Sequence, residues 1–346
     1  MYKCFLVWSV CVMQAWVAMS QDVKKYHELV NKAELYITDN KEEEALMLYQ
    51  VAFKENFDHF SKDYYNALLC AIKMKADSSC IKYAQELVKR GVPVVFFNQP
   101  HLQYVNYIKD ISALYKEIEI KIDKNLLDTI SLMIKEDQQY RVDDVAQQDV
   151  IQKIDEFNYN RIVRIFKKYG YPSELLTGTT MIQNGRRIGT RSDFDVLLTH
   201  QLKNGHCELM EHLKHSLRKG SLNPEVFVTH ATYCFEEEQR LGCFNRNQEV
   251  YFQIDSLIFT CDPADEASVD KIRKQYYLCT IGELKKKVHF AFDKLKKQPY
   301  SLHCNYSVTY RMLNGNSLDE NIQELKKKNA NIILFKALKS NEPYFW

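Results

Sequence analysis

The sequence predicts a mainly all-α protein in which N-terminal helical-repeat hairpins pack against a C-terminal helical domain. Apolar and small residues recur at the helical period of about 3.6 residues through long stretches, such as 24–52 and 124–170. Glycine and proline are scarce, with 10 and 7 in 346 residues, which suits helices better than turn-rich β folds. We expect at most a short strand near 250–259, where "YFQIDSLIF" partly alternates.

The chain divides into four predicted segments. These are a signal peptide (1–20), tetratricopeptide-like helical repeats (21–120), a helical domain of unknown function (121–265) and a basic helical C-terminal segment (266–346). The length allows two or three domains. Pro93 and Pro100 bracket an aromatic-rich turn that a charged helix follows, so the main boundary is expected near 120.

The N-terminal stretch "MYKCFLVWSVCVMQAWVAMSQD" has the pattern of a signal peptide. One lysine precedes about fifteen mainly apolar residues, and small residues follow at Ala18 and Ser20. A spanning helix needs about 20 apolar residues, so an uncleaved anchor is the weaker alternative. We expect cleavage before Gln21 and export to the periplasm or cell envelope.

Eight cysteines remain after such a cleavage, and an even number in an exported protein permits disulfides. Cys234 and Cys243 flank an expected loop and form the predicted local pair, with free buried thiols as the alternative. No Cys–x–x–Cys or Cys/His spacing indicates zinc. The sequence therefore predicts no metal and no cofactor. The eight are Cys70, Cys80, Cys207, Cys234, Cys243, Cys261, Cys279 and Cys304.

Residues 24–92 are expected to form two helix pairs. The first pair places apolar or small residues at helical spacing, and the second repeats the pattern less closely at an offset of about 34 residues, as in tetratricopeptide repeats. Such repeats offer a concave protein-binding surface, and a plain helical scaffold is the alternative. The positions of the first pair are Leu29, Ala33, Tyr36, Ala45, Tyr49 and Ala52.

A candidate polar cluster begins in "KEDQQYR", at the end of an apolar helix. Asp137 and Arg141 are four residues apart and share a helix face. Asp155 and Asn158 are three apart on the next helix, and His200 lies on a later one. We expect these residues, together with Gln138, to meet inside the second domain.

The same stretches resemble an uncharacterised bacterial family of helical domains of unknown function, over roughly 130–275. Its pattern runs Asp-Gln-x-x-Arg, Asp-x-x-Asn, Gly-aromatic-Pro, a helix with a His, and Gly-x-x-x-Pro. The matching residues are Asp137, Gln138, Arg141, Asp155, Asn158, Gly170, Tyr171, Pro172, His200, Gly220 and Pro224. Such families are often exported, sometimes after tetratricopeptide-like helices.

The chain departs from this pattern further on. Thr232 and Tyr233 stand where the family carries Asp-Arg. The stretch "QEVYFQ" keeps Gln248 and Gln253, which complete the candidate site, but lacks the family's glycine. The resemblance implies no known reaction, and no catalytic residue is assigned.

Three interpretations of the cluster stay open. It forms a buried polar network, a ligand-binding site, or a hydrolase-like site that uses Asp137, Asp155 and His200 as acid, base or metal ligands. The last lacks a recognisable activated nucleophile. The leading prediction is an exported binding or interaction protein, with a hydrolase-like enzyme as the alternative.

The net charge and its distribution limit the classes of binding partner that the sequence predicts. Lys and Arg total 47 against 45 Asp and Glu, a net charge of +2, which gives no general field for nucleic acid. Residues 266–346 hold 15 Lys and Arg against 8 Asp and Glu. A solvated helix face is expected there, and weak contact with an anionic membrane surface is the alternative. A protein partner is expected on the helical repeats.

Overall fold

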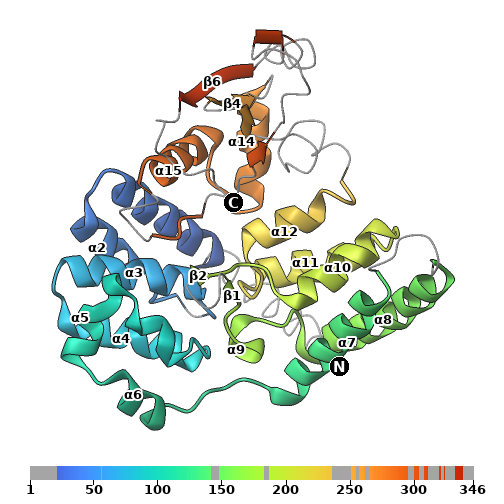
Figure 1. Cartoon of the computed structure of the whole chain (residues 1–346), viewed down its shortest axis with the longest axis horizontal. Coiled ribbons are helices and arrows are strands. Elements are labelled where there is room, and N and C mark those ends of the chain that lie inside the picture. Colours follow the sequence, from blue (N-terminus) through green and yellow to red (C-terminus); the bar gives the residue numbers. More distant parts are fainter. Residues whose placement is uncertain are drawn as a thin grey trace, which may run out of the picture.

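The fold is mainly helical, as the sequence predicts (Figure 1). The computed structural model describes residues 22–55, 57–141, 148–182, 187–235, 251–254, 257–261, 265–294, 300–303, 308–310, 319–320, 323 and 332–337. The predicted signal peptide lies outside these residues. No described helix is both long enough and apolar enough to cross a bilayer.

The N-terminal part is a succession of packed helices. A first helix over 22–38 is followed by α2 (Glu42–Ala52), α3 (Ser61–Lys73) and α4 (Asp77–Lys89). The short elements η1 (Val94–Asn98), η2 (Pro100–Leu102), α5 (Gln103–Ile108) and α6 (Ile111–Glu117) complete it. Two helix pairs are therefore present over 22–89, and their assignment to the tetratricopeptide class stays a prediction.

The middle part carries the second set of helices. These are α7 (Lys124–Gln139), α8 (Gln148–Tyr169), α9 (Glu174–Thr177), α10 (Asp193–Lys203), α11 (Leu209–Arg218) and α12 (Pro224–Ala231). Side chains cap several of them, because Asp123 accepts from the Leu126 amide and Ser192 forms a capping box with Asp195. The sequence predicts that α8 begins near Asp143, but its described part begins at Gln148 and residues 142–147 lie outside the description.

Strands extend beyond the one predicted near 250–259. That stretch forms two strands, β3 (Tyr251–Ile254) and β4 (Leu257–Cys261), paired antiparallel. The sheet has the order β5-β3-β4-β6, with β5 (Val308–Tyr310) parallel to β3 and β6 (Ile332–Ala337) antiparallel to β4. A separate hairpin joins β1 (Met181–Ile182) and β2 (Arg187–Ile188).

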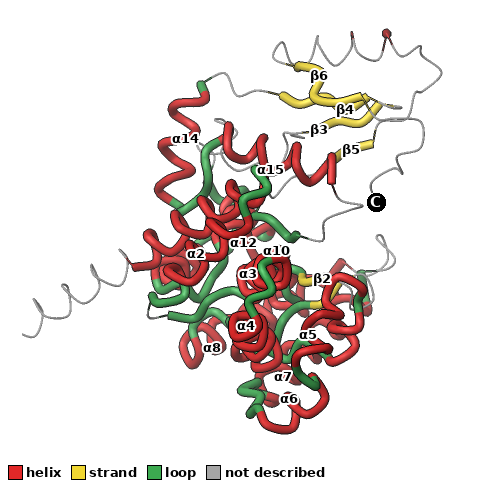
Figure 2. Tube along the Cα trace, turned by 90° about the vertical axis from the view of Figure 1, so that its left-hand side faces the viewer, coloured by secondary structure: helices red, strands yellow, loops and turns green. Residues whose placement is uncertain are grey.

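The C-terminal segment thus adds two strands to its predicted helices, α14 (Glu266–Gln275) and α15 (Ile281–Lys294). Figures 1 and 2 place the four-stranded sheet beyond these two helices, away from α4 and α6.

Two apolar cores lie inside the molecule. The first is built from the N-terminal helices, and the second from α7 to α12. The C-terminal segment contributes to both, since Ile281 lies in the second core while Phe290, Tyr300 and Leu302 lie in the first. Helix α15 and residues 300–303 therefore contact both helical parts.

The two parts also meet at Gly220, directly after α11. Its backbone has a φ of +75°, and a Cβ there would lie 2.5 Å from a ring carbon of Phe57. Gly205, which follows α10, has a φ of +92° but has no atom within 4 Å of the same position. Both turns need glycine for the backbone, and only Gly220 also needs it for space.

We therefore expect Gly220→Ala to destabilise the protein more than Gly205→Ala does. Each substitution costs about 1–2 kcal/mol for the left-handed backbone, and Gly220→Ala also displaces Phe57. Urea denaturation of both variants measures the difference. Equal losses would show that Phe57 does not pack against Gly220.

Candidate functional site

Asp137 is the centre of the predicted polar cluster. It continues the buried stripe of α7, formed by Leu126, Ile130 and Met133, and is itself 1% exposed. Its carboxylate accepts hydrogen bonds from Arg141 Nε at 3.1 Å and Nη2 at 2.9 Å, Gln138 Nε2 at 2.6 Å and His200 Nδ1 at 3.1 Å. Four donors saturate the two oxygens, which have about four acceptor sites.

Asp155 on α8 is linked to Asp137 through Arg141, whose Nη2 donates to both carboxylates. Asn204 Nδ2 donates to Asp155 Oδ2 at 2.8 Å, and Gln201 Nε2 donates to the Asp155 carbonyl at 3.0 Å. Helix α10 and its C-cap residue Asn204 therefore contribute two donors beyond His200 that sequence reasoning missed. Asn204 lies four residues after His200, so the two share a helix face. This spacing could have identified Asn204 from the sequence.

Asp137 and Arg141 keep their charges at neutral pH. Burial raises the pKa of Asp137, but hydrogen bonds from His200 and Arg141 outweigh it, and the pKa falls to about 2. Burial lowers the pKa of Arg141, but the two carboxylates outweigh it, and the pKa is raised. The pKa of Asp137 lies below its usual value, so this stabilisation is present above about pH 4 and is lost as pH falls toward 2.

The donor set could in principle hold a cation. One ligand atom from each of Asp137, Asp155 and His200 lies within 4.8 Å of the others. However, the Arg141 guanidinium already donates to both carboxylates. A metal ion would have to displace Arg141, so the arrangement fits a buried polar network better than a metal centre.

The remaining predicted site residues differ in how they relate to this network. Gln138 is exposed, although it donates to Asp137, so the prediction that it is buried is wrong. Asn158 is buried, and its recorded partner is Arg161 at 3.5 Å. Gln248 lies outside the described residues, as does the side chain of Gln253 in β3.

The Gly-aromatic-Pro turn has a structural explanation. Gly170 ends α8 with a φ of +74°, and Tyr171 then points its hydroxyl at Asp195, to which it donates at 2.8 Å. His230 Nε2 lies 3.0 Å from the same carboxylate oxygen. Asp195 and His230 are both fully buried, so this trio ties α10 to α12 rather than facing a ligand.

The prediction that Cys234 pairs with Cys243 is wrong. Cys234 pairs with Cys207, with the Cα atoms 5.6 Å apart, and Cys243 lies outside the described residues. The bond joins the turn before α11 to the turn after α12. Sequence proximity favoured Cys243, but the packing of α11 against α12 brings Cys207 close instead.

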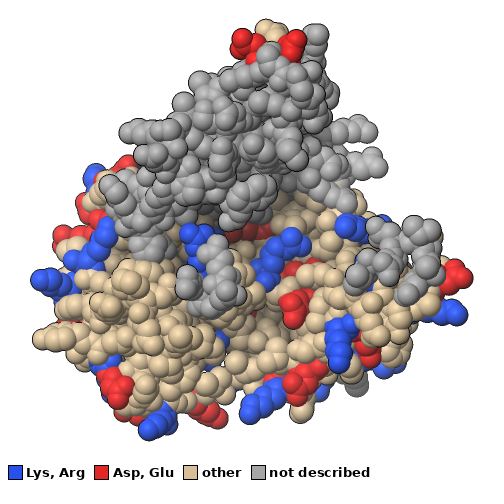
Figure 3. Space-filling view, viewed as in Figure 1, with Lys and Arg blue, Asp and Glu red and all other residues tan. Residues whose placement is uncertain are grey.

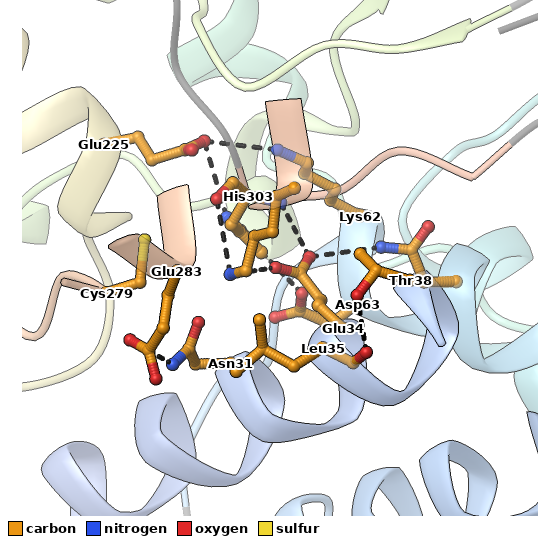
Figure 4. Close-up of polar contacts among 12 residues, drawn as sticks. Asn31, Glu34, Leu35, Thr38, Lys62, Asp63, Glu225, Cys279, Glu283 and His303 are labelled. Carbon is orange, nitrogen blue, oxygen red and sulfur yellow. Dashed lines mark hydrogen bonds and ion pairs between the residues drawn. The ribbon is translucent and has the colours of Figure 1, made fainter. Parts of the chain in front are cut away.

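A second polar cluster, which sequence reasoning missed, lies between the first helix, α3, α12 and α15 (Figure 4). Its carboxylates are Glu34, Asp63 and Glu225, and its cations are Lys62, Lys287 and His303. Glu34 and Asp63 are fully buried, and Lys287 is 1% exposed. Three negative and three positive groups thus compensate one another away from solvent.

The chain segment 300–303 enters this cluster without forming a helix or strand. Asn66 of α3 pairs with Ser301 twice, since its Nδ2 donates to the Ser301 carbonyl and its Oδ1 accepts from the Ser301 amide, both at 2.8 Å. The His303 amide donates to Glu34 Oε1 at 2.7 Å. Tyr300 and Leu302 are buried while Ser301 and His303 are partly exposed, the alternation of an extended chain.

His303 carries a positive charge in this position. Its Nε2 lies 2.6 Å from Asp63 Oδ1 and its Nδ1 lies 3.4 Å from Glu225 Oε2. An imidazole can donate from both nitrogens only when protonated. Burial and Lys62 lower the pKa of His303, but Asp63 and Glu34 outweigh them and raise it to about 10. The pKa values of Asp63 and Glu225 are correspondingly lowered.

The signal for this second cluster is present in the sequence. Glu34 lies on the buried stripe of the first helix, next to Ala33, and Asp63 and Asn66 are three apart on the most buried helix, α3. A carboxylate on an apolar helix face demands a buried partner. The partners come from residues 225, 287 and 303, too distant in sequence to be identified without the fold.

We expect Arg141→Ala to lower the free energy of unfolding by about 1–3 kcal/mol, because it leaves two buried carboxylates with fewer donors. Arg161→Ala is the control. Arg161 pairs with the partly exposed Glu136 on the same two helices, and such pairs contribute about 1 kcal/mol or less. Chemical denaturation compares the two variants. A stable Arg141→Ala that loses a ligand or an activity would instead make the cluster a functional site.

Comparisons of the chain with family models, with curated proteins and with solved structures find no match. The resemblance to the uncharacterised bacterial family therefore stays a prediction.

Proposed function

We propose that this protein is an exported binding protein whose N-terminal helices hold an extended peptide at the site formed by Glu34, Asp63 and Asn66, which we call the groove. The proposal rests on the two hydrogen bonds between the Asn66 side chain and the Ser301 backbone. A side-chain amide that pairs with both the N–H and the C=O of one residue recognises an extended backbone whatever its side chain.

The occupant in this protein is its own segment 300–303, which we name the internal peptide. It meets the groove through the backbone at Ser301 and His303 and through buried side chains at Tyr300 and Leu302. Backbone contacts supply general affinity, and alternate side chains supply specificity, as in other modes of extended-peptide recognition. A groove of this kind supports a role in holding a partner's chain.

Export is part of the proposal. It rests on the signal-peptide pattern at 1–20, and the disulfide between Cys207 and Cys234 supports it because disulfides persist in oxidising compartments. Membrane contact through the basic helix α15 receives less support. Lys287 pairs with Glu34 and Lys286 with Asp39, so both cations are directed at the first helix. Charges of both signs are interspersed on the face drawn in Figure 3.

A hydrolase-like function is the second candidate, favoured by the pair of Asp137 and His200. A buried carboxylate that accepts from Nδ1 leaves Nε2 of a neutral imidazole as a base, and the His200 side chain is 16% exposed. Against it, both carboxylates are already bonded within the protein, and no hydroxyl or thiol is recorded beside His200 among the described residues. The Arg141→Ala experiment separates these roles.

The binding function is tested with a fluorescent peptide, QPYSLHSN, which carries residues 298–305 with serine for Cys304. We expect it to bind the full chain with Tyr300→Ala and His303→Ala at least about tenfold tighter than the wild type, because the tethered internal peptide competes at an effective concentration of about a millimolar. Fluorescence anisotropy measures the affinity, and circular dichroism checks the fold. Ser301→Pro, which removes the amide bonded to Asn66, is the alternative release variant.

The matched control distinguishes the groove from the rest of the surface. Adding Asn66→Ala to the release variant should weaken binding by about tenfold, the loss of roughly 1.4 kcal/mol, whereas Asn160→Ala on the exposed side of α8 should not. No binding to either release variant, or equal effects of the two asparagine substitutions, would contradict the proposed function.

A further inference from the structure

The charged groups around the His303 side chain favour a positive charge at this position. Without this side chain, the described charged groups that face its position are the carboxylates Glu34, Asp63 and Glu225 and the ammonium groups Lys62 and Lys287, which together carry a net charge of −1. Two nearby imidazoles add no charge, because burial lowers the pKa of His27 to about 3 and that of His59 to about 4.

Of these described charges, all except that of Asp63 have a partner of opposite charge. Lys287 pairs with Glu34 at 2.6 Å, and Lys62 with Glu225 at 3.2 Å. Among the described residues, Asp63 then keeps the hydrogen bond from the Tyr26 hydroxyl to Oδ2, while Oδ1 faces the position of the His303 ring. A fully buried carboxylate with a neutral partner alone is costly, so any occupant of the groove must bring a positive group to Asp63 Oδ1.

The positions of the Asp63 and Glu225 oxygens also favour a particular shape of the cation. The His303 ring spans Asp63 Oδ1 on one side and Glu225 Oε2 on the other. A planar cation with donors on opposite edges satisfies both oxygens at once, which an imidazolium or a guanidinium provides. A carboxylate in the same place would add to three existing negative charges.

A second group of side chains surrounds the ring of Tyr300, three residues before His303. Tyr300 is 9% exposed, lies beside Phe290 with ring centroids 6.5 Å apart, and has the Lys73 ammonium 5.3 Å from its ring centre. The Cys70 thiol donates to its hydroxyl at 3.8 Å. This mainly apolar pocket with a cation over the ring favours a tyrosine or phenylalanine.

We propose that the groove, if it binds peptides as proposed above, selects a partner segment that carries an aromatic residue and, three positions later, a histidine or arginine. The internal peptide, Tyr300-Ser301-Leu302-His303, is the chain's own copy of this pattern. The partner is thus an extended protein segment, recognised through its backbone by Asn66 and through these two side chains.

A panel of peptides tests the selection on the release variant, with QPYSLHSN as the parent. We expect arginine in place of histidine to keep the affinity within about threefold, alanine to lower it by about tenfold, and glutamate to lower it by about a hundredfold or more. Alanine in place of tyrosine should also lower it by about tenfold. Equal affinity across the panel contradicts the selection while leaving the binding function intact; no binding by any peptide contradicts the binding function itself.

The pH dependence supplies a readout that needs no further protein variant. Free histidine has a pKa of about 6.5, so the parent peptide must take up a proton to bind above that pH. Its affinity should then fall by about tenfold in total between pH 7 and 9, toward that of the alanine peptide, while the arginine peptide, always charged, should not change in this way. Parallel pH profiles for the two peptides would overturn the requirement for a cation.

Discussion

The buried ion pair between Lys287 and Glu34 is the contact on which the position of the C-terminal segment depends. The two residues come from helices 253 positions apart in sequence, and both are almost completely removed from solvent. A buried charge is tolerated only when its partner is in place. Because the partner of Glu34 comes from α15, the first helix and α15 must be packed together for either charge to be stable.

This constraint explains why the groove is filled. With α15 in place, residues 300–303 lie against α3 and the first helix, where Asn66 and Glu34 accept hydrogen bonds from their backbone amides and Asp63 pairs with His303. The apolar side chains of the same segment complete the first core. Charge pairing sets the register, and apolar burial provides most of the favourable free energy.

The two polar clusters illustrate what the sequence can predict. The first follows from local spacing, because Asp137 and Arg141 share a face and Asp137 lies on the apolar stripe of α7. The prediction that they meet Asp155 and His200 is borne out by the hydrogen bonds. Gln138 is exposed because it directly follows the buried Asp137, and adjacent residues on a helix point about 100° apart.

The second cluster depends on contacts that no local pattern contains. Glu34 and Asp63 are recognisable as misplaced charges on buried faces, but Lys287 and His303 are two among many basic residues of the C-terminal segment. The basic composition there suggests a solvated face, and only the packing of α15 on the first helix shows Lys287 buried. The strands β5 and β6 escape prediction for a similar reason, since they pair with β3 and β4 across long stretches of chain.

Amide hydrogen exchange at Ser301 and His303 tests most directly whether the internal peptide occupies the groove in solution. We expect both amides in the wild type to exchange as slowly as those of α3, because both are hydrogen-bonded to buried side chains. In Asn66→Ala the Ser301 amide should exchange much faster, while the amides of α7 keep their wild-type rates. Fast exchange at both positions in the wild type would contradict a seated internal peptide.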